Sequence, residues 1–584
     1  MLTEMDIYTI VLLVSLLAYV AIGNYAGRGV KGLDDYYVAG RRAPTILIVG
    51  TLVASVLSTN AFLGETGFVY AGQAGPYLLF PPTAAMGYVL GAVFFGRYLR
   101  RSEALTVADY FGRRFNSRRV QYAAGVTIVL ALGGYLLAVT QGAAVLLVDL
   151  VGVSYQQGLL LAWVTYTLFT MYAGSRGVIL TDTLMFLLFT CAAFFALLYL
   201  VDAQGGWVEV VTGLVQVESK PEMMSWHGIV GPGTEWDTPM DYLIWALIID
   251  LSWGVVYAVS PWQSSRHLMA ANEHVVLRSA VYACLALILV QIFLYAGAVT
   301  INLSKPDIEP YEQTMIWAAR NIMPEFLGAT LLAGIMAAAL SSASTFLSLV
   351  GFSVNNDLLN DDSQDERRQL RFTRLSMLVV GFITLVMSMF FPPSIFWLIY
   401  FVGTVFASSW GPVAFMSVWS KKITADAAFW GLVVGFVGNV FPKFLDYMGW
   451  ISLPSYLDPI VIGGALSLIA IHIVSSRGKV TRKEKAYRLR LHRTPNQERS
   501  PGRSRATFIA LGIMIVYAVL TTAAYQRWYI LPYQAATNQL ADDGGLNWFT
   551  GEVMVNLLTV VWMVPVALLT IWLVRKSYGK VGNR

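Results

Sequence analysis

Residues 331–354 read LLAGIMAAALSSASTFLSLVGFSV, a run of 24 residues that contains no charged side chain. As a helix it would rise about 36 Å, at 1.5 Å per residue, which exceeds the roughly 30 Å hydrocarbon core of a bilayer. The rest of the chain has the same character: of 584 residues, 57% are hydrophobic and 13% charged, and the mean hydropathy is +0.60. Soluble proteins carry roughly 25% charged residues. The sequence therefore predicts an all-α integral membrane protein, because lipid leaves backbone polar groups no partner outside a helix.

Helices long enough to cross the bilayer are predicted at fifteen places. Each is a run of about 18 or more mainly apolar residues. The predicted spans lie near residues 6–24, 44–71, 76–96, 120–150, 156–173, 178–202, 241–262, 279–302, 325–353, 375–391, 394–419, 426–442, 458–476, 506–525 and 552–574.

The basic residues give these spans an orientation. If the N-terminus is outside and every span crosses once, the inner loops hold 35 of the 40 Lys and Arg residues, in agreement with the positive-inside rule. We therefore expect a multi-pass protein of the inner (plasma) membrane with an outer N-terminus and a cytoplasmic C-terminus. The most basic loop, residues 477–505, is interpreted as a topology determinant that rests near anionic lipid, not as a nucleic-acid site.

Several kinds of chemistry are excluded by the residue types present. Cys191 and Cys284 both lie in apolar runs, which argues against a disulfide framework or a cysteine zinc site. The sequence contains no glycine-rich phosphate loop, metal-ligand cluster or nucleophile elbow. We therefore expect neither an enzyme nor an ATPase, so that any pumping must draw on an ion gradient.

Hydroxyl groups gather on one face of the run at 331–354. Four residues follow the i, i+3, i+4, i+7 spacing of one helical face: Ala338, Ser341, Ser342 and Thr345. Ser344 lies at the border of that face. Sodium is a hard cation that neutral oxygens hold, so stacked hydroxyls would suit it. Small hydroxyl residues are also common where membrane helices pack closely or where hydroxyls bond back to the helix's own carbonyls. From the spacing alone, packing is the commoner explanation.

Two carboxylates at membrane depth need an explanation, because an ionisable group there is costly unless it is paired or functional. Asp182 lies near the inner end of the sixth span, at a depth similar to that of Thr345. It could meet the hydroxyl face or pair with Arg176, which lies just before it in the sequence. Asp250 lies near the midplane of the seventh span, where it either binds a ligand or satisfies a neighbouring helix.

Two of the predicted spans have interrupted patterns. In the second, the polar run from Ser58 to Asn60 is followed by Glu65 between two glycines. In the seventh, Ser260 and Pro261 break the helix. Interrupted helices whose ends face a cavity are the usual sign of a transporter binding site.

Five motifs make the chain resemble the sodium/solute symporter family, in its bacterial type. The resemblance runs from about Asp34 to Ser475. The motifs are DDYYVAGRRAP at 34–44, ASVLSTNAFLG at 54–64, GSRGVILTDTL at 174–184, SPWQSSRHLMAANE at 260–273 and AAALSSASTFLSLVGFSVNNDL at 337–358.

The resemblance implies the LeuT-type fold, in which two inverted five-helix repeats follow one extra helix; about four more helices follow here. The expected segments are an N-terminal helix and inner loop (1–43), the first repeat (44–202), an outer loop (203–240), the second repeat (241–419), two accessory helices (420–476), a basic cytoplasmic linker (477–505) and a C-terminal helix pair with a short tail (506–584).

The resemblance also implies sodium sites. The principal site would use backbone carbonyls and two hydroxyls from the residues Ala54, Leu57, Ala338, Ser341 and Ser342. A second site, which only some members have, would use Asp182, Ser341, Ser344 and Thr345. We therefore expect two Na⁺ per cycle, with Na⁺ as the coupling ion.

The expected substrate site departs from the better-known branches. Its residues would be Val56, Ser58, Thr59, Asn60, Trp253, Val256, Tyr257 and Gln263. Val56 stands where several relatives place a polar or acidic residue, and Trp253 and Val256 replace polar groups that contact sugar in the sugar carriers. A sugar needs many hydrogen-bond partners, so a small zwitterion or carboxylate, such as an amino acid, is favoured.

The sequence thus predicts a sodium-coupled symporter that imports a small polar organic solute by alternating access, with a monomer sufficient for transport. Two alternatives stay open: a transporter-like solute sensor, and a proton-coupled symporter of the same fold. Accumulation of solute in vesicles, driven by sodium, distinguishes the prediction from both.

Overall fold

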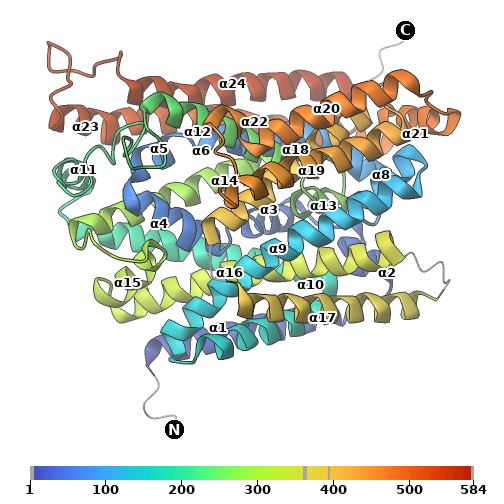
Figure 1. Ribbon diagram of the computed structural model, residues 1–584, viewed down its shortest axis with the longest axis horizontal. Helices are drawn as coiled ribbons and strands as arrows, with labels where there is room; N and C mark the ends of the chain where they lie inside the picture. The colour runs from blue at the N-terminus through green and yellow to red at the C-terminus, as the bar shows by residue number, and fades with distance from the viewer. Residues whose placement is uncertain (1–5, 360–364, 392–394, 580–584) are drawn as a thin grey trace.

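The computed structural model describes residues 6–359, 365–391 and 395–579, and throughout these ranges the regular structure is helical. The long helices lie side by side along the longest axis of the molecule (Figure 1). Among the described residues, twelve helices are long and apolar enough to cross a membrane, or thirteen if a bent pair of helices forms one more span. The prediction of an all-α multi-pass membrane protein is confirmed.

The helices of membrane-crossing length have the following bounds. They are α1 (Ile7–Gly27), α9 (Arg118–Val151), α10 (Tyr155–Asp202), α12 (Pro239–Val259) with α13 (Pro261–Met269), α14 (Glu273–Thr300), α16 (Glu325–Ser353), α17 (Glu366–Phe390), α18 (Ile395–Trp419), α19 (Ala425–Tyr447), α20 (Pro459–Arg477), α22 (Pro501–Tyr525) and α24 (Gly551–Tyr578).

Shorter helices connect these elements or form parts of broken spans. They include α2 (Leu33–Val38), α3 (Thr45–Ala54), η2 (Asn60–Glu65), α4 (Thr66–Phe68), η3 (Val69–Gln73), α5 (Ala74–Leu79), α6 (Pro81–Gly91), η4 (Ala92–Gly96), α7 (Arg97–Ser102), α8 (Val107–Phe115), α11 (Trp207–Val215), α15 (Thr314–Asn321), η7 (Val354–Leu359), α21 (Arg482–His492) and α23 (Leu531–Ala536).

The predicted spans at 156–173 and 178–202 both lie in α10, which is broken between them at Gly174. The φ of Gly174 is 54° and its ψ is −150°, a conformation that glycine adopts most readily because it has no Cβ. A Cβ here would also lie 2.7 Å from the backbone oxygen of Tyr36. The predicted second and third spans are likewise divided into short helices, with a bend of 54° between Asn60–Leu79 and Pro81–Ser102. The count of fifteen spans stays a prediction.

The helix α16, which contains the run at 331–354, lies in the centre of the bundle. From Leu331 to Ser353 all of its side chains are buried. It packs between α9 and α10, and a Cβ on Gly334 would lie 3.2 Å from the Cα of Phe189 in α10. Small residues allow such close backbone approach between membrane helices. The sequence of α16 therefore suits a helix surrounded by protein on every side.

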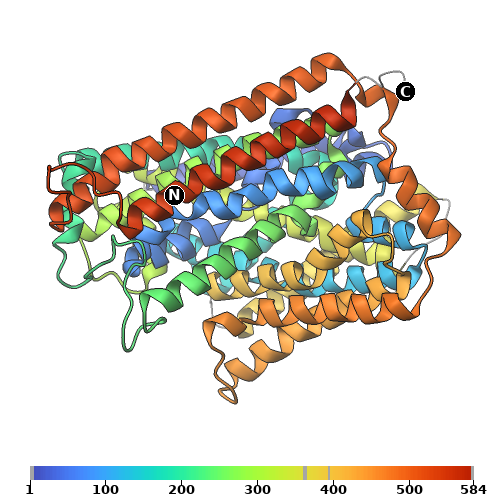
Figure 2. The ribbon, with the colours of Figure 1, turned by 90° about the horizontal axis from the view of Figure 1, so that it is seen from above.

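Two pairs of accessory helices flank this core. α19 packs against α20, and α22 packs against α24. Figure 2 shows the α22–α24 pair along one side of the bundle and the α19–α20 pair along the opposite side. The core contacts of the second pair are to α14 and α6. The centre of the bundle is thus formed by the helices that carry the interrupted patterns and the hydroxyl face.

Candidate functional site: two broken helices and a buried carboxylate

The second predicted span is interrupted where its polar run begins. α3 ends at Ala54, and a π-helical turn begins at Asn60. The last carbonyls of an α-helix have no partner within the helix, so the end of α3 places hydrogen-bond acceptors at the break. One side chain in the break, Ser55, donates its hydroxyl to the Leu52 carbonyl at 3.2 Å.

The seventh predicted span is interrupted at Ser260, as its sequence predicts. α12 ends at Val259 and α13 begins at Pro261, with Ser260 outside the helical region between them (φ −57°, ψ 145°). Proline disfavours helical geometry in the residue before it. The side-chain amide of Gln263, in α13, donates to the Ser55 hydroxyl at 3.1 Å. The two breaks are therefore in direct contact.

The hydroxyl face of α16, which consists of Ser341, Ser342, Ser344 and Thr345, is fully buried, and α16 contacts both α3 and α13. Ser341 donates to Oδ1 of Asp182 at 2.8 Å, and Ser344 donates to the Ser341 carbonyl at 2.9 Å. The hydroxyl of Ser342 has no hydrogen-bond partner among the described residues. A buried polar atom without a partner costs about 1–3 kcal/mol. Ser342 thus has an oxygen available for a ligand.

The Asp182 carboxylate lies within a cluster of polar groups from several helices. Thr51, in α3, donates to its Oδ2 at 2.6 Å. The guanidinium of Arg266, in α13, lies 3.5 Å from the same oxygen. Arg266 also donates to Thr51 at 3.1 Å and to the hydroxyl of Thr345. Thr345 therefore meets Asp182 through the arginine, whereas Ser341 meets it directly.

The alternative interpretation, in which Asp182 pairs with Arg176, is wrong. Arg176 donates to the Gly29 carbonyl at 2.7 Å and lies 3.8 Å from Asp35. The true partner, Arg266, is 1% exposed, although its position in the sequence places it in a predicted inner loop. Pro261 is the sequence feature that could have predicted this burial. A proline that starts a new helix indicates that the residues after it, including Arg266, form a separate helix, α13, which packs inside the protein.

A cavity of about 90 Å³ lies among η2, the α5–α6 region, α12, α14 and α18. One water needs roughly 10–15 Å³ by the same measure, so the cavity has room for several waters or a small solute. Its walls include two carboxylates, Glu65 and Asp250. Glu65 accepts hydrogen bonds from Asn60 at 3.0 Å and from the hydroxyl of Tyr295. Oδ2 of Asp250 is buried and has no partner within the described residues.

Aromatic rings form much of the rest of the cavity wall. Trp253 and Tyr257, both predicted substrate residues, line it with ring centroids 5.7 Å apart. Tyr257 also stacks on Tyr88, with centroids 4.9 Å apart and planes at 8°. The cavity therefore combines two carboxyl groups with flat aromatic surfaces.

The predicted substrate residues fall into two groups. Asn60, Trp253 and Tyr257 line the cavity. The others lie outside its lining; they are Val56, Ser58, Thr59, Val256 and Gln263. Among these, the Thr59 hydroxyl and the Gln263 Oε1 are buried without a partner in the described part of the chain, so unpaired oxygens also occur around the helix breaks.

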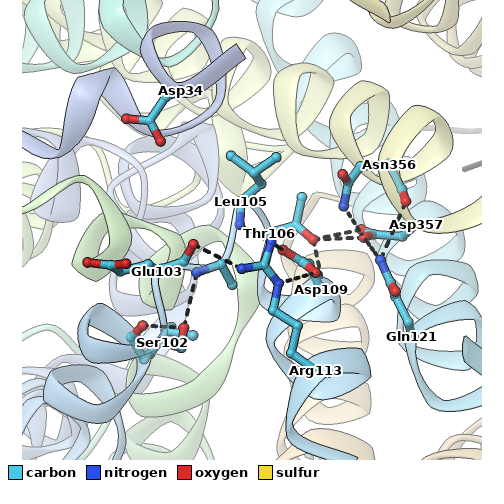
Figure 3. A network of polar contacts seen from close by, with 12 residues as sticks. Asp34, Ser102, Glu103, Leu105, Thr106, Asp109, Arg113, Gln121, Asn356 and Asp357 are labelled. Atoms are coloured by element: carbon cyan, nitrogen blue, oxygen red, sulfur yellow. Dashed lines mark hydrogen bonds and ion pairs between the residues drawn. The ribbon is translucent and has the colours of Figure 1, made fainter. Parts of the chain in front are cut away.

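The end of α16 beyond its hydroxyl face is held by a network of polar contacts (Figure 3). Asp357, in η7, accepts hydrogen bonds from Thr106 at 2.8 Å and from the side-chain amide of Gln121 at 2.9 Å. Thr106 in turn caps α8, where Asp109 is paired with Arg113 at 2.8 Å. This end of α16 is thus fixed to α8 and α9.

Comparison with known proteins places the chain in a family. A family model described as the sodium:solute symporter family matches residues 36–435. The chain belongs to the sodium:solute symporter family. The matched range contains both helix breaks and the Asp182 cluster. It begins after α1 and ends within α19.

Curated relatives of this symporter include two bacterial carriers. The sodium/pantothenate symporter of Escherichia coli strain K12 is 27% identical over 453 residues, which cover 75% of this chain and 89% of the relative. The sodium/proline symporter of Salmonella typhimurium is 24% identical over 487 residues, covering 79% and 91% of the two chains.

Solved structures support the fold of this symporter. A substrate-bound, outward-open Na⁺-coupled sialic acid symporter superimposes with a TM-score of 0.69 at 20% identity, covering 82% of this chain and 99% of that one. Mhp1, a transporter of the nucleobase-cation-symport-1 family, gives a TM-score of 0.53 at 11% identity, with coverages of 78% and 98%. The predicted LeuT-type fold is confirmed.

Proposed function

We propose that this protein imports a small zwitterionic or carboxylate solute together with Na⁺ by alternating access. The chain is a sodium-coupled symporter of a small solute, as its family membership and the sodium/pantothenate and sodium/proline carriers among its relatives support. The observation that carries the proposal is the contact of two broken helices beside a buried face of hydroxyls.

The principal sodium ion would bind between the end of α3 and α16. Backbone carbonyls of Ala54, Leu57 and Ala338 and the hydroxyls of Ser341 and Ser342 would be its ligands. The buried, unpartnered hydroxyl of Ser342 supports this assignment. An ion here would hold α3 against α16 and so order the nearby breaks. Sodium and solute would then each raise the affinity of the other, because coupling between two sites is reciprocal.

A second sodium ion would bind at Asp182, with Ser341, Ser344 and Thr345. Arg266 already contributes a positive charge 3.5 Å from Asp182. The second ion must therefore share Asp182 with the guanidinium or displace it. We propose two Na⁺ per cycle; each charge that enters a cell at −100 mV adds about 2.3 kcal/mol of driving free energy.

The solute would bind in the cavity between η2 and α12. An ammonium group would find the Asp250 carboxyl group, which has no partner in the described part of the chain, and the rings of Trp253 and Tyr257 along the same face of α12. Cations are attracted to aromatic faces within about 6 Å. The aromatic faces and the two acidic side chains, Glu65 and Asp250, thus favour a zwitterion over a purely anionic solute.

The membrane placement follows from the basic loops. We propose an inner-membrane protein with its N-terminus outside and its C-terminus in the cytoplasm. Both broken helices and the α16 face belong to one chain, so a monomer would suffice for transport. Outward and inward states would alternate by opening either the cavity side or the side held by the Asp357 network.

The first experiment identifies a ligand. The purified protein is screened by thermal unfolding against zwitterions and carboxylates, with and without sodium, because a bound ligand stabilises the fold by mass action. A solute that stabilises the protein only when sodium is present is then tested for uptake in proteoliposomes.

The second experiment tests the principal sodium site. Ser342→Ala should abolish sodium-stimulated uptake and reduce the stabilisation by sodium to the contribution of the second site. Ser348→Ala is the matched control, because Ser348 is equally buried in α16 but donates to its own helix at Thr345. The control should keep the sodium response. An unchanged sodium response in Ser342→Ala would refute the site.

A further inference from the structure

A second polar cavity lies where α7, the end of α18, the segment after α21 and the end of α24 meet. In Figure 1, α21 and the end of α24 lie at the opposite end of the molecule from α11. The volume of this cavity is about 540 Å³. Residues from α21 onward lie beyond the range that the family model matches. By the orientation proposed above, this cavity opens at the cytoplasmic surface of the membrane.

Positive charge dominates the cavity wall. Five cationic side chains line it: Arg97, Arg101, Arg493, Arg499 and Lys576. Of these five, Arg101 is already bound to a carboxylate, Glu273, by two hydrogen bonds, one of them 2.7 Å long. Among the described residues, Arg97, Arg493, Arg499 and Lys576 form no ion pair. The cavity therefore holds an excess of uncompensated charge.

Arg97 is the side chain that most requires an anion. It is 3% exposed, and its guanidinium donates only to neutral oxygens: the Val93 carbonyl, the Ser577 hydroxyl and the Tyr98 hydroxyl, at 2.9, 2.9 and 3.0 Å. A buried charge without a counter-ion costs several kcal/mol. Arg499 adds a second sign of a missing partner, since its buried Nε has no acceptor in the described part of the chain.

One wall of the cavity is apolar and continues into the outer surface of the bundle. Leu573, in α24, and Trp419, at the end of α18, line the cavity. Directly beside Leu573, Trp572 is 55% exposed, and one turn earlier Leu569 is 40% exposed. A ligand that fills the cavity with an anionic group can thus extend an apolar chain along α24 into the bilayer.

We propose that this cavity binds the phosphate headgroup of an anionic phospholipid of the inner leaflet. The phosphate would accept hydrogen bonds from Arg493, Arg499 and Lys576 and compensate the charge of Arg97. Basic pockets between membrane helices on the cytoplasmic side are suited to such headgroups. A free phosphate shares the same chemistry but would leave the apolar wall at Leu573 uncovered. The bound lipid would link the C-terminal helix pair to the transporter core.

The test uses the full-length protein in detergent with added phosphatidylglycerol or phosphatidylcholine, and native mass spectrometry to measure bound lipid. The pocket variant is Arg493→Gln/Lys576→Gln, which spares the buried Arg97. The control variant is Lys483→Gln/Lys485→Gln, which removes the same charge from exposed positions of α21 outside the cavity.

Wild type and control should bind phosphatidylglycerol more tightly than phosphatidylcholine. The pocket variant should bind phosphatidylglycerol on the order of 30-fold more weakly than wild type, because each basic residue near an anionic headgroup contributes about a fivefold gain. Equal binding by the pocket and control variants would overturn the proposal. Displacement of the lipid by millimolar inorganic phosphate would overturn the choice of lipid and assign the cavity to free phosphate.

Discussion

The ion pair between Asp182 and Arg266 allows a quantitative test of the second sodium site. The two charged groups are 3.5 Å apart and at most 1% exposed. With an effective dielectric constant of about 20, their attraction is roughly 5 kcal/mol. Removing one partner leaves the other charge buried and should cost about 3–5 kcal/mol, whereas removing both should cost much less.

Three variants form a double-mutant cycle: Asp182→Asn, Arg266→Met and the combination of the two. Each is unfolded by denaturant in mixed micelles, with tryptophan fluorescence as the signal. We expect each single variant to lose about 3–5 kcal/mol of unfolding free energy and the double variant to regain most of that loss. A coupling energy below about 1 kcal/mol would show that the charges do not stabilise one another.

Sodium distinguishes a structural ion pair from an ion-binding site. In Arg266→Met the Asp182 carboxylate is left without its cation, so sodium should bind there and restore stability. At a sodium concentration 100 times the dissociation constant, the gain is about 2.7 kcal/mol. Asp182→Asn should show no such gain beyond that of the principal site. Equal sodium responses in the two single variants would refute Asp182 as a sodium ligand.

The remaining predictions concern the cavity, the outer loop and helix packing. Asp250→Asn should weaken the affinity for a zwitterionic solute about 10- to 100-fold, the loss expected for a charged hydrogen bond, while sodium binding stays unchanged; a calorimetric titration that shows unaltered solute affinity would contradict the role of Asp250. Burial lowers the pKa of Lys220, in the loop before α12, from 10.5 to about 8. Between pH 8 and pH 10.5 Lys220 binds a proton in the unfolded chain more often than in the folded protein, so the unfolding free energy should rise with pH by up to about 3 kcal/mol. Unfolding curves of Lys220→Gln measured over this pH range should lack the rise. Gly87→Ala should destabilise the protein by about 1–3 kcal/mol, because its Cβ would lie 2.0 Å from the Gly254 oxygen. Gly254→Ala, whose Cβ would have no neighbour closer than 3.6 Å, should unfold at the wild-type temperature.

The interruptions of the two spans follow from local sequence and could be predicted. Pro261 cannot supply the backbone N–H that a continuous helix needs and restricts Ser260, so α12 ends where the sequence indicates. The polar run from Ser58 to Asn60 similarly coincides with the break after α3. Such features depend only on neighbours in the chain.

The two carboxylates show where local reasoning ends. The depth of Asp182 in its span left two partners open, the hydroxyl face and Arg176, and in the structure Ser341 of the hydroxyl face donates to it. Its cation, however, is 84 positions away in the sequence, at Arg266. The sequence placed Asp250 near the midplane of the membrane. It could not show that Asp250 and Glu65 line the same cavity, because α12 is apolar on most of its circumference and no face of it stands out.

The sequence by itself determined that this protein lies in a membrane, which helices are interrupted and which face of α16 carries hydroxyls. These properties arise from composition, from the 3.6-residue period and from the covalent geometry of proline, all of which act over a few residues. Only the tertiary structure decided that Arg266 neutralises Asp182, that Asp250 and Glu65 share one cavity and that Arg97 is buried without a carboxylate. Those pairings depend on how distant helices pack, and in an interior of low dielectric constant the packing decides which charges are compensated and which still need a ligand.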